Sequence, residues 1–320
     1  MCNSDFHKTE GYMDRFEAMR TVLAAVDGGS LSAASRSLRL PLATVSRRVS
    51  DLEARLGAQL LVRTSRRLQL TEEGAAYVSA ARRILDDLDD AERTVSGEYR
   101  VPRGELVVTA PIMFGKLHVA PIVQEFLAAY PDVSVRLVLV DGVIDLVEAH
   151  VDVAVRIGHL PDSTLIGRRL GDVCWLFCAS PEYLERKGRP DHPSEISEHE
   201  CIAFEGLQQY REWPFYENGQ TRGVAIQPRF SVNTADAVVE AAMAGLGVAR
   251  VMCYQAAEAM SGGAVLPVLP KYWLPAIPVH LVFGQRQQQP LKIRAFLDFV
   301  TPRLRDRLAS VRHVTELAGG

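Results

Sequence analysis

The side chains with the clearest chemistry are the arginines near the start of the chain. Residues 13–71 hold ten Arg against five Asp or Glu, whereas residues 72–100 carry a net charge of −4 and residues 101–320 a net charge of −3. A guanidinium group donates paired hydrogen bonds to phosphate oxygens. A compact basic segment on an acidic body therefore predicts contact with a polyanion, which the overall net charge of −3 conceals.

Three short helices are predicted to position these arginines. Apolar residues recur at helical spacing over residues 14–27. Ser30 is a good N-cap for a second helix over residues 31–38, and a third helix is expected over residues 42–56, ended by Gly57. Two short helices joined by a tight turn behind a supporting helix form a helix-turn-helix.

The third helix and the segment after it are expected to contact DNA. The first turns of such a helix lie in the major groove, so Thr44 and Arg47 are expected at base edges. Ser46 and Arg48 suit phosphates, and residues 59–70 are typical of a small β-wing with a basic tip. The predicted DNA-binding residues are Ser30, Ser32, Leu42, Ala43, Thr44, Ser46, Arg47, Arg48, Arg63, Thr64, Arg66 and Arg67. The alternative is a small helical domain with a solvated basic face.

Residues 72–100 are predicted to form a long linker helix and a hinge, with Thr71 as N-cap. The apolar residues of this helix repeat at alternating spacings of four and three, which is typical of a coiled-coil seam. They are Tyr77, Ala81, Ile84, Leu88, Ala91 and Val95. The seam predicts dimerisation, which would space two basic heads for two DNA half-sites. The alternative is a long helix that lies on its own domain.

Beyond residue 100, strand and helix patterns alternate, which predicts an α/β body with a mostly parallel sheet. Strands are expected over residues 106–109, 133–140, 151–157, 174–179, 201–204, 224–232, 248–251 and 279–283. Helices are expected over residues 116–130, 144–149, 181–187, 234–244 and 291–307.

Two strand-to-helix junctions of this body are candidate ligand sites, at residues 109–114 and at residues 233–236. Ligands of open α/β sheets bind beyond the carboxyl ends of strands, and free N–H groups at helix N-termini favour anions. A small carboxylate is therefore the expected ligand, with Asn233 as a helix N-cap and Trp213 as a further apolar wall. The predicted binding residues are Thr109, Ala110, Pro111, Ile112, Phe114, Phe204, Asn233 and Thr234. Ordinary turn and core side chains are the alternative.

Other chemistry is not expected from the sequence. Five cysteines are too few for a disulfide scaffold. Cys174 and Cys178 are expected to be reduced, buried thiols, with a redox or metal pair as the alternative. We find no nucleophile elbow, phosphate loop or zinc-protease motif, so no catalytic residue, metal or cofactor is expected. The N-terminus does not read as a secretory signal, and no apolar run reaches the roughly 18 residues of a membrane helix, so a cytoplasmic, nucleoid-associated protein is expected.

Several motifs of the basic head resemble the LysR-type transcriptional regulators, and the likeness extends over about residues 13–310. The motifs depart from the family in the turn, where Arg39 replaces a common Gly and Pro41-Leu42 replaces a common Ser-Gln. They are Met13-Asp14-Arg15-Phe16-Glu17-Ala18-Met19, Gly29-Ser30-Leu31-Ser32-Ala33-Ala34, Thr44-Val45-Ser46-Arg47-Arg48, Leu52-Glu53, Leu56-Gly57, Leu60-Leu61, Arg63-Thr64 and Leu70-Thr71-Glu72-Glu73-Gly74.

The resemblance implies an all-α-type winged helix-turn-helix domain over residues 13–71, followed by a periplasmic-binding-protein-like effector domain over residues 101–320. It divides that α/β domain into subdomain I (about 101–167 and 275–320) and subdomain II (about 168–274), and leaves residues 1–12 as a disordered extension. It also implies a regulator that controls promoters in response to a small effector, with double-stranded promoter DNA and a second copy of the chain as partners, in a dimer or a dimer of dimers. RNA polymerase is a candidate partner. A solute-binding transport protein and an α/β enzyme are the rival classes.

Overall fold

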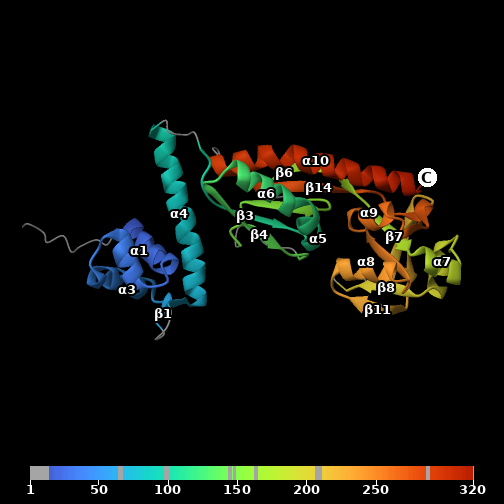
Figure 1. The fold of residues 1–320 in the computed structure, drawn as a ribbon, viewed down its shortest axis with the longest axis horizontal. Helices are drawn as coiled ribbons and strands as arrows, with labels where there is room; N and C mark the ends of the chain where they lie inside the picture. Colours follow the sequence, from blue (N-terminus) through green and yellow to red (C-terminus); the bar gives the residue numbers. More distant parts are fainter. Residues whose placement is uncertain are drawn as a thin grey trace, which may run out of the picture. The chain divides into compact units, whose positions relative to one another are not determined.

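The computed structural model divides the chain into two compact units, residues 1–100 and residues 101–320 (Figure 1). The expected extension over residues 1–12 and the wing tip over residues 64–67 lie outside the described residues. The structure describes residues 14–63, 68–96, 101–142, 146, 149–161, 165–205, 211–285 and 289–319.

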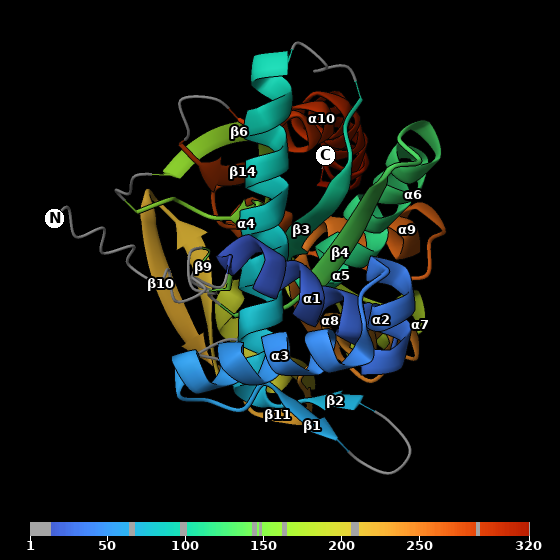
Figure 2. The ribbon, with the colours of Figure 1, turned by 90° about the vertical axis from the view of Figure 1, so that its left-hand side faces the viewer.

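The first unit is a winged helix-turn-helix with a long helix attached (Figure 2). Its two short strands pair antiparallel, with Leu61 opposite Leu70. The predicted caps are confirmed: the Ser30 hydroxyl accepts a hydrogen bond from the Ala33 N–H, and Gly57 ends its helix in the left-handed conformation. The elements are α1 (Arg15–Asp27), α2 (Leu31–Leu38), α3 (Leu42–Leu56), β1 (Leu61–Arg63), β2 (Leu68–Leu70) and α4 (Glu72–Ser96).

The core of the first unit is built from small side chains of the three short helices. The buried face of α1 is lined by small residues: Ala18 and Ala25 are fully buried, whereas Phe16 stays 39% exposed. Thr21 is also buried, and its hydroxyl donates to the Glu17 carbonyl, which offsets the cost of burial. Small residues on this face let α1 approach its neighbours closely. The core residues are Ala18, Val22, Ala25, Ala34, Val45, Val49, Leu52, Leu60, Leu61 and Val78.

Helix α4 begins at the predicted N-cap, because the Thr71 hydroxyl accepts a hydrogen bond from the Gly74 N–H at 2.9 Å. A Cβ on Gly74 would lie 2.0 Å from the Leu60 carbonyl oxygen, so only glycine allows this close approach. Ion pairs from Arg82 to Asp27 and from Arg20 to Asp89 link α4 to α1. Helix α4 is thus held against its own unit.

The second unit contains two five-stranded sheets. Sheet I has the order β4-β3-β5-β14-β6 and sheet II the order β11-β8-β12-β7-β13. Both are mixed rather than mostly parallel, because β6, β7, β13 and β14 carry the chain between the sheets and pair antiparallel. The strands of sheet I are β3 (Gly104–Ala110), β4 (Val133–Leu139), β5 (Val153–Ile157), β6 (Leu165–Val173) and β14 (Ile277–Gly284). Those of sheet II are β7 (Trp175–Ala179), β8 (Cys201–Phe204), β11 (Pro228–Val232), β12 (Val248–Met252) and β13 (Leu266–Val268).

Helices cover both sheets, and a hairpin packs on sheet II. In sheet I, α6 and α10 lie along the strands (Figure 1). The hairpin strands are β9 (Glu212–Glu217) and β10 (Gln220–Ala225). The helices are α5 (Ile112–Phe114), the π-helical turn Gly115–Val119, α6 (Ala120–Ala129), α7 (Pro181–Lys187), α8 (Ala235–Met243), α9 (Cys253–Ser261) and α10 (Leu291–Gly319); short 3₁₀ turns are Pro193–Glu198 and Pro270–Tyr272.

The chain passes between the sheets at a single residue. Strand β6 belongs to sheet I as far as Val173, and β7 starts sheet II at Trp175, so Cys174 is the junction. The sequence placed this passage earlier, at about residue 168. The return passage follows the turn Pro270–Tyr272, close to where it was expected.

Several elements differ from the sequence predictions. The strand expected over residues 224–232 is divided into β10 and β11, because β10 pairs with β9 in the hairpin whereas β11 pairs with β8 in sheet II. The predictions also missed β6, β9, β13 and α9, and α10 runs twelve residues beyond the expected end at Arg307, to Gly319. Most of the helix expected over residues 144–149 lies outside the described residues.

One stretch, Ile112–Ala129, is long and apolar enough to cross a membrane, contrary to the sequence analysis. Its large side chains Phe114, Ile122 and Phe126 are fully buried in the main core of the second unit. With 33% of the stretch buried, one face of it packs into the core of this unit.

Candidate DNA interface and effector site

The first turns of α3 present an exposed surface. Leu42 is 46% exposed, and Ala43 and Arg47 are exposed beside it, while Val45 and Val49 on the opposite face are buried. Packing of the two valines in the core of the first unit therefore aims residues 42, 43 and 47 outward. This surface is suited to the edge of a base pair in a major groove.

The other predicted DNA contacts are placed unequally. Arg48 makes a 2.7 Å ion pair with Glu17 of α1, so its guanidinium is already partly neutralised. Ser32 is exposed, whereas Thr44 and Ser46 are half-buried and the Ser30 hydroxyl is used as the α2 cap. Thr64, Arg66 and Arg67, with the side chain of Arg63, lie outside the described residues.

The turn between α2 and α3 is strained. Arg39 ends α2 in the left-handed conformation, with φ of 55° and ψ of 40°, where a glycine has no penalty. Arg39 stands where the family motif commonly has a glycine, and an arginine adopts this left-handed conformation at an energetic cost. The arginine also adds a positive charge beside α3.

The predicted seam of α4 is divided between two environments. Ala81 is fully buried within the first unit, and Tyr77 packs against its core. Ile84 is 43% exposed and Leu88 is half-buried, so these two are the described seam residues open to a partner. The side chains of Ala91 and Val95 lie outside the described residues.

In the second unit, the first predicted ligand junction follows β3. Thr109 is fully buried and its hydroxyl donates to the Val138 carbonyl at 2.8 Å, which removes it as a ligand contact. Ala110 and Phe114 are also fully buried, so these two side chains form core in this structure. Pro111 is half-buried and Ile112 exposed, and the Ile112 N–H donates to the Asp141 carboxylate at 2.9 Å.

The second junction begins α8. Its N-cap is Thr234 rather than the predicted Asn233, and both are exposed. The Asp236 carboxylate accepts from the Ala237 N–H, and its pKa is lowered, first by a hydrogen bond with Thr234. Phe204 is half-buried at the end of β8, whereas Trp213 is buried in the core beneath the hairpin and is not a site wall.

The structure brings the two junctions together across the two sheets. Lys116, beside the first junction, lies 3.8 Å from the Asp236 carboxylate. The Phe114 ring packs edge-on against Tyr254 of α9, and His118 contacts both rings. Burial, together with the positive charge of Arg307, lowers the pKa of His118 to about 4. This aromatic group joins sheet I to the helices of sheet II.

A buried arginine at this end of sheet II was missed by the sequence analysis. Arg250 of β12 is only 9% exposed, and its guanidinium lies 4.3 Å from the centre of the Trp175 ring. Among the residues that the structure describes, no carboxylate or carbonyl accepts from it, and its Nε atom is buried without a partner. Burial lowers the pKa of Arg250 to about 10. The signal in the sequence was an arginine inside an apolar strand, Val248–Met252.

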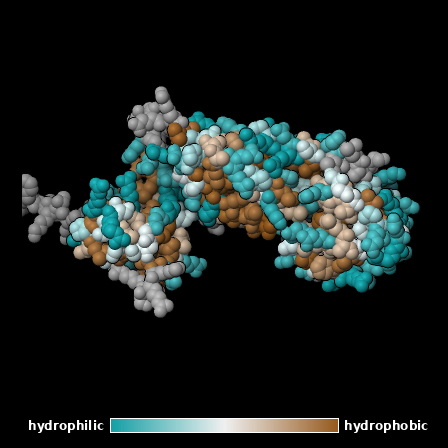
Figure 3. Space-filling model, viewed as in Figure 1, coloured by the Kyte–Doolittle hydropathy of each residue, from teal (hydrophilic) through white to brown (hydrophobic). Residues whose placement is uncertain are grey.

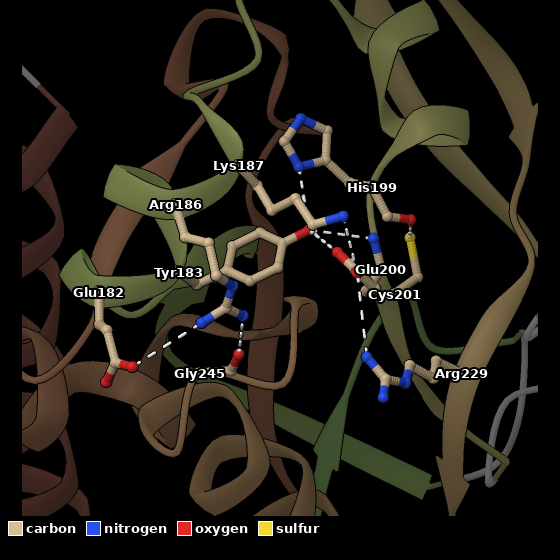
Figure 4. Close-up of polar contacts among 9 residues, drawn as sticks. All are labelled: Glu182, Tyr183, Arg186, Lys187, His199, Glu200, Cys201, Arg229 and Gly245. Atoms are coloured by element: carbon tan, nitrogen blue, oxygen red, sulfur yellow. Dashed lines mark hydrogen bonds and ion pairs between the residues drawn. The ribbon is translucent and has the colours of Figure 1, made fainter.

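A second polar group lies elsewhere in sheet II and has a structural role (Figure 4). The buried Tyr183 hydroxyl accepts from the Glu200 N–H, donates to the Glu200 carboxylate at 2.9 Å, and lies 3.0 Å from His199 Nδ1. Lys187 pairs with the same carboxylate at 3.0 Å and, with Tyr183, lowers the pKa of Glu200 to about 2. These contacts fasten α7 to β8.

Comparisons with known proteins agree with this architecture. Residues 16–75 match the model of the bacterial regulatory helix-turn-helix protein, lysR family, and residues 100–305 match that of the LysR substrate binding domain. An HTH-type transcriptional regulator of Xanthomonas campestris is 37% identical over 283 residues, covering 87% of this chain and 82% of the relative. A transcriptional repressor of Pseudomonas aeruginosa is 35% identical, covering 90% and 92%.

Solved structures show the same organisation. The structure of CrgA, a LysR-type transcriptional regulator from Neisseria meningitidis, is 32% identical, with a TM-score of 0.59 and coverage of 90% of this chain and 98% of that one. These families comprise regulators of transcription, not enzymes. On its two domain matches and its full-length relatives, the chain belongs to the LysR-type family of DNA-binding transcriptional regulators, with an effector-binding domain.

Proposed function

We propose that the chain binds promoter DNA as a homodimer or a dimer of dimers and that a small carboxylate effector controls this binding. On the DNA side, the support is the outward face of α3, where Arg47 is exposed one turn from Ala43. Arg47 reads base edges, while the basic wing contacts phosphates in any sequence.

Self-association is supported by two surfaces. The exposed Ile84 and half-buried Leu88 of α4 offer one apolar contact. In the second unit, hydrophobic side chains gather over β4, the edge strand of sheet I, where Val135 and Leu137 remain only partly buried (Figure 3). An apolar edge strand is suited to pairing with a second copy.

The anionic character of the effector rests on one observation, the buried Arg250. The helix N-termini at the two junctions already have carboxylate partners, Asp141 and Asp236, so they offer little to an added anion. A buried charge without a partner is costly, which favours a site that an anion completes.

The position of Arg250 points its guanidinium toward the ligand edge of sheet II. Residue 250 opposes Phe177, yet the guanidinium covers Trp175, which opposes Met252 at the carboxyl end of β12. The side chain therefore leans toward the edge where β8, β11 and β12 end. Ligands of α/β sheets bind at this edge.

The test is a thermal-shift screen of the full-length protein with small mono- and dicarboxylates and their amides. A carboxylate that binds the folded state raises the unfolding temperature, and its amide does not. Arg250→Met should abolish the shift, whereas Arg229→Met, an exposed arginine on the same sheet, should retain it. A carboxylate shift that survives in Arg250→Met contradicts the assignment of Arg250, and a shift with amides alone contradicts an anionic effector.

The DNA function is tested separately, by fluorescence anisotropy with the duplex upstream of the gene. Binding should weaken steeply as salt is raised, because released counterions drive the attachment of basic side chains to phosphates. The family places such regulators in the cytoplasm; we propose association with the nucleoid and contact with RNA polymerase at the regulated promoter. Salt-independent binding would contradict the proposed interface.

A further inference from the structure

Two cysteines face each other at the junction of the two sheets. The ladder of β7 and β12 ends with Trp175 opposite Met252, so the next residues, Cys174 and Cys253, are opposed. The Cys253 N–H donates a hydrogen bond to the Cys174 carbonyl at 2.8 Å. The Cys174 N–H donates to Cys253 Sγ at 3.3 Å. The sequence alternative had paired Cys174 with Cys178, but four residues along one strand separate their Cα atoms by roughly 13 Å.

The geometry of this pair allows a covalent link. Cα atoms of directly opposed residues in an antiparallel ladder are about 4.5 to 5.5 Å apart, which is within the range that a disulfide spans. Both thiols are free, and the backbone of Cys174 contacts Cys253 through two hydrogen bonds.

The two sulfurs differ in burial and in hydrogen bonding. Cys253 Sγ accepts a hydrogen bond from the Cys174 N–H, and the neighbouring thiol and backbone of Cys174 lower the pKa of Cys253. The interaction with the Cys253 side chain, and then burial, raise the pKa of Cys174. Cys253 is only 2% exposed, whereas Cys174 is half-buried, so a small oxidant reaches the pair from the Cys174 side. Thiolate character is what makes a cysteine an attacking nucleophile.

We propose that Cys174 and Cys253 form a peroxide-oxidisable dithiol at the junction between the two sheets of the effector domain. The Cys253 thiolate attacks one peroxide oxygen, the O–O bond breaks, and the departing hydroxide leaves as water after protonation, so that Cys253 becomes a sulfenic acid. The Cys174 thiol attacks the sulfenic sulfur and the S–O bond breaks, which releases a second water and forms the disulfide. Two thiols lose two electrons and two protons, and the peroxide is reduced.

The place of the pair gives oxidation a structural consequence. Cys174 is the one residue between β6 of sheet I and β7 of sheet II, and Cys253 begins α9. The next residue, Tyr254, packs against Phe114 of the other sheet's helix. A bond between the cysteines ties the passage between the sheets to α9 and so restrains relative movement of the two sheets.

The experiment treats the reduced full-length protein with hydrogen peroxide, blocks free thiols with iodoacetamide, digests the protein, and maps peptides by mass spectrometry. The expected product is a Cys174–Cys253 peptide pair, two hydrogen atoms lighter than the separate thiol peptides, that dithiothreitol separates. Cys178 and Cys201, which are buried thiols of the same sheet with pKa values raised to about 12, serve as internal controls and should remain thiols. This readout is independent of DNA and of any effector.

Variants separate the two steps of the reaction. Cys174→Ser should leave Cys253 as a sulfenic acid that dimedone traps, and Cys253→Ser should leave Cys174 as an unmodified thiol. The wild-type map does not depend on whether either variant folds. Recovery of both cysteines as free thiols, or a disulfide of either one with Cys178, Cys201 or a second chain, would overturn the proposal.

Discussion

The candidate contact surfaces of the two units are built in opposite ways. In the first, the exposed residues 42, 43 and 47 come from two turns of one helix, α3, and a valine face behind them sets their direction. In the second, the candidate effector site draws on residues that lie far apart in the chain, among them Lys116, Asp141, Asp236 and Arg250.

This difference shows which kind of site can be recognised from local patterns. Helical periodicity already separates the buried and exposed faces of α3, so the candidate contacts follow from spacing. The effector site depends on which strand ends meet, and the core between them decides which side chains remain available. Thr109 and Phe114 were predicted as ligand contacts from the sequence. In the structure both side chains are fully buried, and the Thr109 hydroxyl donates to a backbone carbonyl.

The largest expected effect tests whether the two units are stabilised separately. Phe114→Ala removes a fully buried ring that contacts His118 and Tyr254, and should cost the second unit about 3 to 5 kcal/mol of unfolding free energy. Hydrogen exchange of the full-length protein should accelerate in the second unit and not in α1–α3. Phe230→Ala, which truncates a ring that is 37% exposed, is the control and should have little effect. Equal acceleration of hydrogen exchange in both units would contradict the idea that the two units are stabilised separately.

The next effect tests single-helix recognition. Arg47→Ala should weaken binding to the operator by about 1 to 3 kcal/mol, and should weaken binding to an unrelated duplex much less, because a base contact is lost. Fluorescence anisotropy with both duplexes measures this difference. Arg55→Ala, an exposed arginine at the other end of α3, should change operator binding only slightly. Equal losses on both duplexes for Arg47→Ala would assign it to phosphates.

A smaller effect concerns pH and the contact between the two sheets. The folded protein holds His118 neutral down to about pH 4, whereas the ring titrates near 6.5 when unfolded. Between these values the unfolded chain binds more protons, so the stability present above pH 6.5 falls as the pH approaches 4. The loss should be about 1 to 2 kcal/mol, since the partly accessible ring is screened by solvent. Chemical denaturation across this range should show a shallower fall for His118→Phe; an unchanged profile would exclude His118 as its source.

The smallest effect concerns the turn before α3. Arg39→Gly should stabilise the first unit by about 0.5 to 1 kcal/mol, because φ of 55° penalises a side chain and not a glycine. Gly29→Ala, at φ of 67°, should have the opposite sign. Slower hydrogen exchange in α2 and α3 measures the gain. A loss of stability in Arg39→Gly would mean that the arginine side chain makes a compensating contact.

Much of the fold was predictable from local signals. The bounds of α2, α3 and α7 agree with the predictions, because each has a clear N-terminal residue and a clear stop. The hairpin strand β9 and helix α9 were missed, since neither has a strong boundary signal in the sequence. The predicted α4 seam was only partly right about its partner for a related reason: periodicity identifies an apolar face but not what packs on it. Tyr77 and Ala81 pack within their own unit.

Local features of the chain were enough to predict the basic head and the outward face of its third helix, because charge, spacing and caps act over a few residues. The class of protein came from motifs that resemble the LysR-type regulators. Two features follow from the packed fold alone: Arg250 is buried with no counter-ion among the described residues, and Cys174 meets Cys253, 79 positions away. Such contacts are set by strand order and register, which depend on the energy of the whole packed core rather than on any one segment.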